Sequence, residues 1–318
     1  MIRMAASCLS PRGARARLSV LIFHRVLPQA DPLQPDAPDA QHFEKILRWV
    51  SGWFRVLPLD EAVSRLASGS LPSRAAAITF DDGYADNATT ALPVLQRVGL
   101  PATFFVATSF LDGGRMWNDT VIEAVRACRA AQLDLRTAGL GLFDVQTLEQ
   151  RRHAIDRLLP AIKYLEPSQR EAAVSAVQVA SGKTLPGDLM MSSQQVRALR
   201  QAGMLIGAHT RTHPILTRCA DADAAAEIAG SKHDLEALLG EPVTLFAYPN
   251  GKPQADYDRR HAEMVRRAGF VAALSTAPGA SSCRSDLYQL PRFTPWDRQP
   301  LKFGIRMVAN LRCYATQA

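Results

Sequence analysis

Two adjacent carboxylates stand at the end of an apolar segment, in the sequence TFDDGY at residues 79–84. The preceding residues 75–78 are Ala-Ala-Ala-Ile, which favours a buried strand that ends near Asp81. Neighbouring like charges repel each other unless a cation separates their roles. A divalent metal would do so, with one carboxylate as its ligand and the other free to act as a general base.

Two histidines further along the chain, His209 and His213, offer the remaining ligands. Their spacing of four residues would put both imidazoles on one face of a helix, one turn apart. One Asp and two His make a three-ligand set that leaves one position of a zinc ion open for water. These residue types therefore point to a hydrolase.

The bulk composition is that of a globular protein with a sizeable core. The chain has 318 residues, of which 47% are apolar and 21% are charged, and a single α/β barrel reaches this size. The net charge is +7, with a sequence pI of about 9.4. Because the basic residues are spread along the chain and no aromatic–basic recognition module is found, we expect no nucleic-acid partner. An anionic membrane surface or a cell-wall polymer fits the excess charge better.

The cysteines and the N-terminus bear on the compartment. The five cysteines are scattered, without a CxxC pair, which is typical of isolated thiols in a reducing compartment. Residues 1–17 are basic and lack the apolar stretch of a signal peptide, and no segment has the ~20 apolar residues of a membrane span. These features favour a cytoplasmic or membrane-peripheral location.

Short apolar segments alternate with helical patterns along the chain. Strands are predicted near residues 19–25, 75–80, 102–107, 204–209, 243–248, 270–275 and 288–293. Helices are predicted near residues 40–51, 59–68, 86–98, 117–131, 147–159, 168–180, 192–202, 221–239 and 257–268. This alternation favours a parallel sheet covered by helices. Seven strands are one fewer than the regular eightfold barrel has.

A single barrel over residues 18–318 is expected to follow the basic segment 1–17. Residues 113–188 contain helical patterns without a convincing strand, so we expect a helical insertion that covers one side of the barrel mouth. A basic, amphipathic helix is predicted near 300–312. It would either close the bottom of the barrel or lie on an anionic membrane, and closure of the bottom is favoured.

The candidate residues all follow predicted strands. Asp81 and Asp82 follow the second strand, His209 follows the fourth and Pro249 the fifth. In a parallel barrel the carboxyl ends of the strands share one rim, so side chains remote in sequence meet there.

These segments resemble the polysaccharide deacetylase family, which is also called the NodB-homology or carbohydrate esterase family 4 domain. TFDDGY at 79–84 is similar to its first motif, and HTRTH at 209–213 to its His-x-x-x-His motif. The resemblance covers roughly residues 18–295, apart from the insertion. It implies an α/β fold of the distorted (β/α)7 TIM-like barrel type. It also implies that Asp81 is the general base and that Asp82, His209 and His213 are metal ligands, with zinc as the favoured ion.

The third family motif departs from the usual Arg-x-Pro pattern. Here it is AYPNG at 247–251, so the backbone N–H of Asn250 would still donate to an oxyanion, but Ala247 replaces the arginine that orients the base. Arg292 is a candidate to replace that cation. The last family motif normally supplies a histidine acid, and QLPRF at 289–293 contains none.

His24 is expected to replace the missing acid. It ends the first predicted strand, in VLIFHR at 20–25, which is similar to the Tyr/Phe-His segment of the subgroup that deacetylates poly-N-acetylglucosamine exopolysaccharide. Histidine exchanges its proton near neutral pH, which suits this role. The implied reaction is removal of N-acetyl groups from N-acetylglucosamine units of a polysaccharide or its precursor. Deacetylation of polymers often takes place outside the cytoplasm, and a lipid-linked precursor would reconcile this with the location favoured above.

Alternative interpretations remain for these residues. Asp81 and Asp82 could form a solvated turn or cap the helix that follows, and His24 could be a core residue. Tyr84 is expected to pack beneath its loop, and Trp117 and Trp296 either stack on sugar rings or serve as buried anchors. The same barrel could hydrolyse a small non-sugar amide, or bind glycan without turnover. The polymer, the native metal and the oligomeric state stay open.

Overall fold

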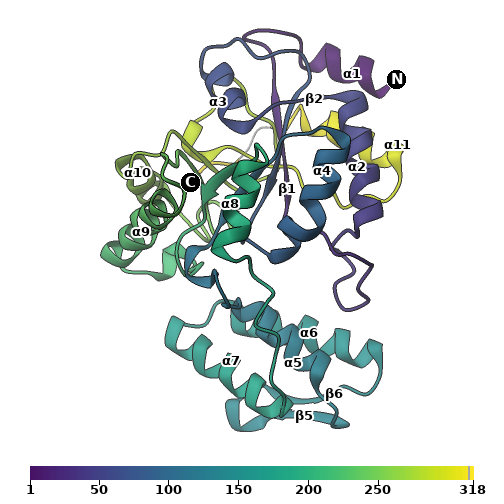
Figure 1. The fold of residues 1–318 in the computed structure, drawn as a ribbon, viewed down its shortest axis with the longest axis vertical. Helices are drawn as coiled ribbons and strands as arrows, with labels where there is room; N and C mark the ends of the chain where they lie inside the picture. The colour runs from purple at the N-terminus through teal and green to yellow at the C-terminus, as the bar shows by residue number, and fades with distance from the viewer. Residues whose placement is uncertain (314–315) are drawn as a thin grey trace.

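A computed structural model describes residues 1–313 and 316–318 of the chain. Its main feature is a curled sheet of seven parallel strands in the order β1-β3-β4-β7-β8-β9, with β2 paired to β3 (Figure 1). The strands are β1 (Leu18–Phe23), β2 (Arg55–Val56), β3 (Ala75–Phe80), β4 (Thr103–Val106), β7 (Leu205–Ala208), β8 (Leu245–Ala247) and β9 (Ala272–Leu274). Six predicted strands are thereby confirmed, and the two-residue β2 was not predicted.

The seventh predicted strand, 288–293, is wrong as a regular strand. The segment closes the ring between β9 and β1 through isolated bridges, in which Leu290 pairs with Leu274 and Phe293 pairs with Leu21. Pro291 lies between these two bridges and has no N–H to donate, so the pairing cannot continue through it. The result is the distorted barrel that the resemblance implies.

Strand residues face two different cores because successive side chains point to opposite sides of a sheet. In β1, Leu18 and Val20 belong to a cluster inside the barrel, whereas Leu21 and Phe23 pack in a larger cluster beneath the surrounding helices. Side chains of α3 (Leu59–Ala67) belong to the inner cluster, so this helix closes the bottom of the barrel. Ten of the other helices and short turns surround the sheet or connect its strands. They are α1 (Ile2–Leu9), α2 (Ala40–Trp53), η1 (Asn87–Ala91), α4 (Leu92–Val98), η2 (Thr108–Phe110), α8 (Ser193–Gln201), η4 (Leu216–Arg218), α9 (Asp221–Leu239), α10 (Arg259–Arg267) and η5 (Leu287–Gln289).

The two terminal helices lie on the side of the barrel. The expected C-terminal helix is present as α11 (Pro300–Asn310), but its place at the barrel bottom was wrong: Phe303 packs against Trp49 of α2, with ring centroids 5.7 Å apart. Gly304 lets α1 approach closely, since a Cβ there would lie 2.9 Å from a side-chain carbon of Ile2. The helix α1 falls in the segment that was described only as basic. Among the described residues, no helix has both the length and the apolar character needed to span a membrane.

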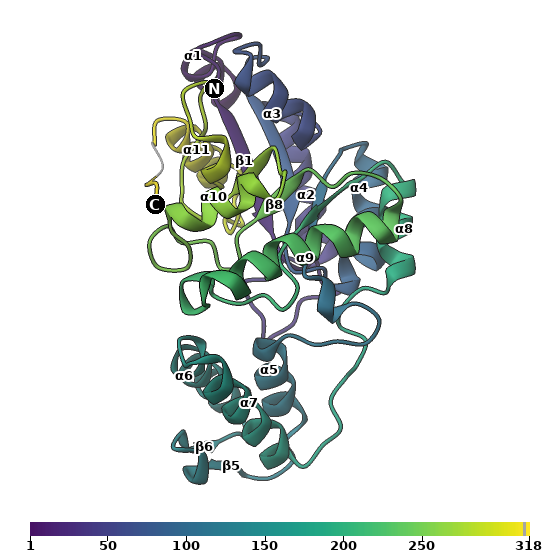
Figure 2. The same cartoon turned by 90° about the vertical axis from the view of Figure 1, so that its left-hand side faces the viewer.

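Residues between β4 and α8 form a separate lobe, drawn below the barrel in Figures 1 and 2, at the end opposite to α3. It consists of α5 (Trp117–Ala127), β5 (Gln132–Leu135), η3 (Arg136–Ala138), β6 (Gly141–Asp144), α6 (Leu148–Lys163) and α7 (Pro167–Ser181). These elements share a hydrophobic cluster of their own, which also takes in Leu33. The expectation of a strand-free insertion was wrong, because β5 and β6 form an antiparallel hairpin. Each of the two strands has only four residues, which is too short for a clear alternation in the sequence.

Candidate metal and catalytic site

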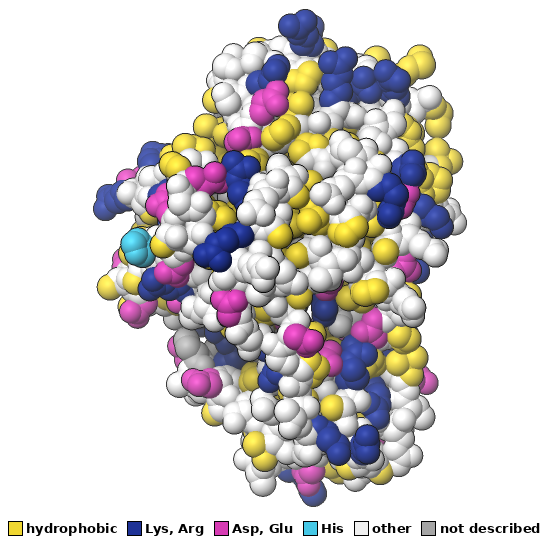
Figure 3. Space-filling view, viewed as in Figure 1, with side chains coloured by type: hydrophobic (Ala, Val, Ile, Leu, Met, Phe, Trp, Pro, Cys, Tyr) yellow, Lys and Arg dark blue, Asp and Glu magenta, His cyan; other side chains and the backbone are white. Residues whose placement is uncertain are grey.

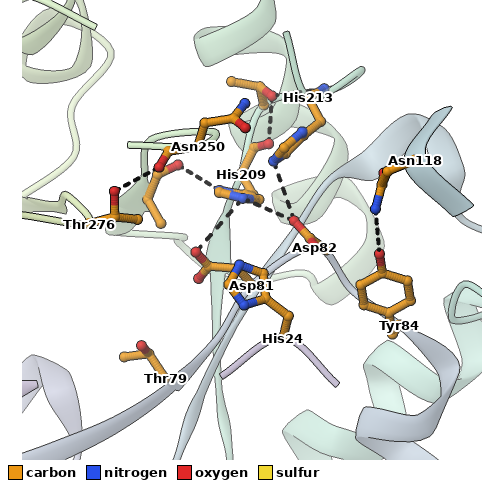
Figure 4. Close-up of polar contacts among 12 residues, drawn as sticks. His24, Thr79, Asp81, Asp82, Tyr84, Asn118, His209, His213, Asn250 and Thr276 are labelled. Atoms are coloured by element: carbon orange, nitrogen blue, oxygen red, sulfur yellow. Dashed lines mark hydrogen bonds and ion pairs between the residues drawn. The ribbon is translucent and has the colours of Figure 1, made fainter. Parts of the chain in front are cut away.

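Asp82, His209 and His213 meet at the carboxyl ends of β3 and β7 (Figure 4). The Oδ1 atom of Asp82 lies 3.4 Å from Nε2 of His209 and 3.3 Å from Nε2 of His213. One ligand atom from each residue lies within 4.8 Å of the other two. The structure thus brings together the three residues expected to hold a metal.

The donor set fits a divalent cation. A tetrahedral zinc site with metal–ligand distances near 2.0–2.1 Å separates neighbouring ligand atoms by about 3.3–3.4 Å, which matches the distances from Asp82 Oδ1. This oxygen is buried and has no hydrogen-bond partner among the described residues. A buried carboxylate oxygen without a donor is costly, and a cation between the three side chains would satisfy it.

The two imidazoles are held by tertiary contacts, and the expected helix is absent. Residues 209–213 form a loop after β7, so the prediction that His209 and His213 share a helix face was wrong. The Nδ1–H of His209 donates to the carbonyl of Ala247 over 2.7 Å, which turns Nε2 toward Asp82. Such an outer partner fixes the tautomer of a ligating histidine.

The loop that carries the histidines is fixed by the helix α9. The Glu227 carboxylate accepts hydrogen bonds from the backbone N–H groups of Arg211 and Thr212, each over 2.8 Å. The Arg211 guanidinium binds both oxygens of Asp234 on the same helix. These contacts replace the bonds that a helix would have supplied.

Left-handed backbone angles gather at the site. Seven described non-glycine residues have a positive φ, and four of them lie here, with values of 76° at Asp82, 62° at Thr210, 55° at His213 and 58° at Asn250. Such conformations cost free energy for residues with a Cβ and persist only where the surroundings impose them. The fold therefore holds these side chains in positions that a relaxed turn would not adopt.

Asp81 points to the same rim and is paired with Arg292. The two guanidinium nitrogens Nη1 and Nη2 donate to Oδ1 and Oδ2 of Asp81, each over 2.7 Å. Arg292 is fully buried and also donates from Nε to the carbonyl of Ser275. Arg292 thus occupies the place that was predicted for it as the substitute for the arginine missing at Ala247.

Local charges set the protonation of the site. Burial alone would raise the pKa of Asp81, but the nearby Arg292 guanidinium and His209 lower it below the usual value. Burial opposes ionisation of Asp82 as well, yet the close approach of His209 and His213 lowers its pKa well below the ordinary range. Burial lowers the pKa of His213 to about 3. His213 is therefore neutral near pH 7 and has a free lone pair for a metal.

Asn250 lies in the turn after β8. Its carbonyl accepts a hydrogen bond of 2.7 Å from the Thr276 hydroxyl, and its own N–H has no acceptor within the described part of the chain. The Gly251 N–H and the Pro249 carbonyl close the turn over 2.6 Å. A fixed N–H without a partner, on the rim that carries His209, suits the expected oxyanion donor.

His24 follows β1 at the edge of the site, and its side chain is exposed. A positive charge on this ring would help to lower the pKa values of Asp81, Asp82 and His213. The Nδ2–H group of Asn87 holds the His24 carbonyl over 2.9 Å, and Asp86 binds the Val26 N–H over 3.0 Å. The polar residues after TFDDGY thus fix the turn that carries His24.

A cavity of about 660 Å³ opens beside these residues. The barrel supplies His24, Asp82 and Trp296 to its walls, and the insertion supplies Asp119 and Leu159. Loop 34–38 lines it as well. The cavity brings the insertion to the mouth of the barrel, as was expected.

Tyr84 and Asp119 form a buried contact between the barrel and the insertion. The Tyr84 hydroxyl donates to Oδ1 of Asp119 over 3.2 Å, and the Arg25 guanidinium lies 4.6 Å above the Tyr84 ring. Oδ2 of Asp119 is buried and has no partner among the described residues. Burial raises the pKa of Asp119 to about 7. Tyr84 is buried, as the packing prediction requires, and it also lines the cavity.

Comparison with known proteins gives the family. The family model for polysaccharide deacetylases matches residues 68–273, which is well over half of the chain. The chain belongs to the polysaccharide deacetylase family. A protein of this family removes acetyl groups from polysaccharides, so the deacetylase is a hydrolase.

Relatives of the deacetylase are distant in sequence. YxkH of Bacillus subtilis (strain 168), provisionally named a polysaccharide deacetylase, is 21% identical over 279 residues, which cover 87% of this chain and 71% of YxkH. The Streptococcus pyogenes deacetylase PplD, solved with acetate, is 16% identical with a TM-score of 0.61, covering 94% of this chain and 99% of PplD. IcaB from Ammonifex degensii is 20% identical with a TM-score of 0.58, covering 96% and 99%. At these identities, the two structures establish the shared fold.

Sequence reasoning missed several residues that shape the site. Glu227 and Asp234 lie in a long helix where acidic residues are ordinary, so the pattern contains no sign of their contacts with the histidine loop. Asp119 lies in the first turn of α5, where an acidic residue is usual, and its burial could not be expected. The sequence contained one signal of such supporting contacts: the polar pair Asp86-Asn87 follows Asp81 and Asp82 by only a few residues.

Proposed function

We propose that the deacetylase removes N-acetyl groups from N-acetylglucosamine units of a polysaccharide or its precursor, with a divalent metal and zinc as the favoured ion. One observation carries this proposal. A buried carboxylate oxygen of Asp82, without a hydrogen-bond partner among the described residues, faces two imidazoles, next to a second carboxylate, Asp81, that Arg292 binds through both oxygens.

Asp82, His209 and His213 would hold the metal. When bound, the ion supplies positive charge that polarises the acetyl carbonyl and lowers the proton affinity of water. The Ala247 carbonyl keeps the His209 ring in the orientation that this role needs. The left-handed backbone at Asp82 and His213 fixes the other two ligands.

Asp81 accepts the proton of the attacking water. Its lowered pKa keeps it ionised at neutral pH, and the bidentate contact with Arg292 sets its direction. Water then adds to the carbonyl carbon, and the carbonyl oxygen becomes negatively charged. The Asn250 N–H, which has no other acceptor among the described residues, donates to this oxygen.

His24 gives a proton to the nitrogen of the leaving amine as the carbon–nitrogen bond breaks. The products are acetate and a glucosamine unit, and the proton on Asp81 returns to solvent. The exposed position of His24 at the cavity wall suits a group that must exchange its proton with water in each cycle. Trp296, on the same wall, offers an aromatic face for a sugar ring.

The test compares Asp81→Asn with the unchanged protein on acetylated glucosamine oligomers. We expect acetate release to fall by about 10²–10⁴-fold, the usual contribution of a general base, while the metal content stays the same. Asp134→Asn, an exposed carboxylate in the insertion, is the matched control and should keep full activity.

The outcomes separate the alternatives. Acetate release by Asp81→Asn at the normal rate would remove Asp81 from the role of base. Hydrolysis of small acetamides without any release from sugar oligomers would favour the small-amide hydrolase. Glycan binding by a protein that takes up no metal would favour a binding barrel without turnover.

A further inference from the structure

The helices α1 and α11 each bury one face and leave apolar side chains on the other. Met1, Met4, Leu301, Ile305 and the neighbouring Trp296 are between 53% and 84% exposed. They make up five of the ten large apolar side chains that are exposed in the described part of the chain. We call the exposed side chains of α1 and α11, with Met1 and Trp296, the terminal face.

The terminal face is one continuous region. Gly304 of α11 contacts Ile2 of α1, so the two helices are packed together. Both lie on the side of the barrel away from α8 and α9 in Figures 1 and 2. On the face shown in Figure 3, basic and acidic side chains are interspersed, and apolar side chains gather along the upper right edge, near α1 and α11.

The excess positive charge of the protein is concentrated in the same two segments. Residues 1–17 and 298–318 each contain four Lys or Arg and no Asp or Glu. These eight cations exceed the net charge of +7, so the other 280 residues together carry a net charge of −1. The basic residues are spread along the chain, but their numerical excess over acidic residues lies in these two segments.

Most of these cations are available to a partner. The side chains of Arg3, Arg12, Arg15 and Arg312 have no carboxylate partner among the described residues, and all four residues are exposed. Arg306 is an exception, because its guanidinium is paired over 2.7 Å with the buried carboxylate of Asp297. Lys302 lies 3.7 Å from the same carboxylate, yet its side chain is largely exposed.

We propose that the terminal face docks on a membrane that contains anionic lipids. Interfacial membrane helices lie along the surface and present apolar and basic side chains without acidic ones. The exposed residues of α11 and the turn after it are Pro300, Leu301, Lys302, Ile305, Ala309, Arg312 and Cys313. A surface made only for water would mix both signs of charge, as the rest of this protein does.

Docking would bring the lipid surface close to the cavity. Trp296 belongs both to the terminal face and to the cavity wall. Its ring is braced from one side by the Arg306 guanidinium, 4.2 Å from the ring centroid. Exposed tryptophan is favoured at a membrane interface. Resting on the proposed function, this placement suits a sugar substrate that is itself held at the membrane.

The experiment is flotation of the full chain with two kinds of vesicle. One contains phosphatidylcholine alone, and the other also contains about 30% of the anionic lipid phosphatidylglycerol, which gives its surface a negative potential. We expect binding only to the anionic vesicles, and loss of that binding at about 1 M salt, where the Debye length is ~3 Å. Each Lys or Arg near such a surface contributes about a fivefold gain in affinity. The triple variant Arg3→Gln, Lys302→Gln, Arg312→Gln should therefore bind about a hundredfold more weakly.

A second variant tests the apolar part. Met4→Gln, Leu301→Gln and Ile305→Gln together should weaken binding at least about tenfold, since their side chains leave water on docking. Leu142→Gln, Leu148→Gln and Val179→Gln, three exposed apolar residues of the insertion, are the matched control and should bind as the unchanged protein does. Circular dichroism checks that all variants are folded.

Three results would overturn the inference: equal binding to neutral and anionic vesicles, equal loss in the control variant, or a self-associating protein that binds no vesicles and becomes monomeric in the apolar variant. The last result, from sedimentation equilibrium, would assign the terminal face to a second copy of the chain. Acetate release from soluble oligomers is measured in parallel. Vesicle binding without such activity would contradict the proposed function alone, and activity without vesicle binding would contradict this inference alone.

Discussion

The barrel rim and the insertion enclose the same cavity with side chains of different character. On the rim, the charged groups face one another: Arg292 binds Asp81 through both oxygens, and two imidazoles surround Asp82. The insertion contributes apolar and polar side chains in equal number, among them one buried carboxyl, Asp119, with an oxygen that has no partner among the described residues.

The difference assigns separate tasks to the two regions. Rim residues follow strands of the sheet, which fixes their backbone even at left-handed angles, so this region can hold reacting groups in place. The insertion has its own hydrophobic cluster and supplies the opposite wall. We propose that the rim carries the chemistry and that the insertion shapes the space for the substrate.

The largest effect is expected from breaking the ion pair on the rim. Arg292→Met would leave the buried Asp81 carboxylate without its hydrogen-bond donor, which costs about 3–5 kcal/mol of unfolding free energy. Urea unfolding measures the change. In the double variant Asp81→Asn, Arg292→Met no charge is left unpaired, so most of the stability should return. A double variant that is as unstable as the single one would show that Arg292 matters through its packing.

The buried acid of the insertion should respond to pH in the opposite sense from a paired carboxylate. The pKa of Asp119 is about 7 in the folded protein, chiefly because of burial, against an ordinary value of 3.8. Between these pH values the unfolded chain has released a proton that the folded chain retains. The contribution of Asp119 to the unfolding free energy therefore falls as pH rises from about 4 to 7 and is constant above 7. Its total loss is at most about 4 kcal/mol.

Asp119→Asn removes this pH dependence. The variant should match the unchanged protein at pH 4 and be the more stable of the two at pH 8, in urea unfolding without added metal. Asp134→Asn is the control, because Arg136 lowers the pKa of Asp134 to about 2, outside the tested range. Parallel pH profiles for the unchanged protein and Asp119→Asn would mean that Asp119 is ionised when folded.

Metal binding should stabilise the protein through the rim alone. Zinc at a hundred times its dissociation constant adds about 2.7 kcal/mol to the unfolding free energy. His213→Gln removes a ligand and should abolish this gain, whereas His153→Gln, on the exposed side of α6, should leave it unchanged. Thermal unfolding with zinc and with a chelator gives the comparison. An equal zinc effect in both variants would place the ion elsewhere.

The smallest effect is expected at the cavity walls. Trp296→Ala removes an aromatic face from the barrel wall, and Leu159→Ala removes an apolar contact from the insertion wall. Losing about 1 kcal/mol of substrate contact would raise KM about fivefold and leave kcat unchanged. Steady-state kinetics on oligomers of increasing length measures both constants. A fall in kcat for Leu159→Ala would show that the insertion affects the chemical step as well as substrate binding, which would contradict the separate roles proposed for the two regions.

The chain order of strands and the rim residues could be predicted because they depend on local patterns. Apolar runs that end in polar residues mark Asp81, Asp82 and His209 directly. The contacts of these residues could not be derived in this way. Arg292 lies 211 residues from Asp81, and only closure of the barrel brings the two together. The helix predicted for His209 and His213 failed because Glu227 offers the loop its hydrogen bonds from another element.

The parts of the fold that were missed are those with weak local signals. The strands β5 and β6 have four residues each and β2 has two, so their alternation is too short to read. The helix α1 was not predicted, because residues 1–17 were described by their charge alone. Its buried residues Ile2 and Ala6 are four positions apart, as on one face of a helix.

Residues 290–293, which close the barrel, carry a residue of the proposed catalytic site into the C-terminal part of the chain. Arg292 belongs to the segment that joins the last strand to the first, and only isolated bridges flank it. The three proposed metal ligands precede residue 214, and the Glu227 and Ala247 contacts that hold the two histidines precede residue 248, so the ribosome makes this part of the site before the guanidinium that binds Asp81. A chain that ends between residues 248 and 291 would keep Asp82, His209, His213 and the contacts that orient the histidines, but its Asp81 would lack the guanidinium that fixes the carboxylate.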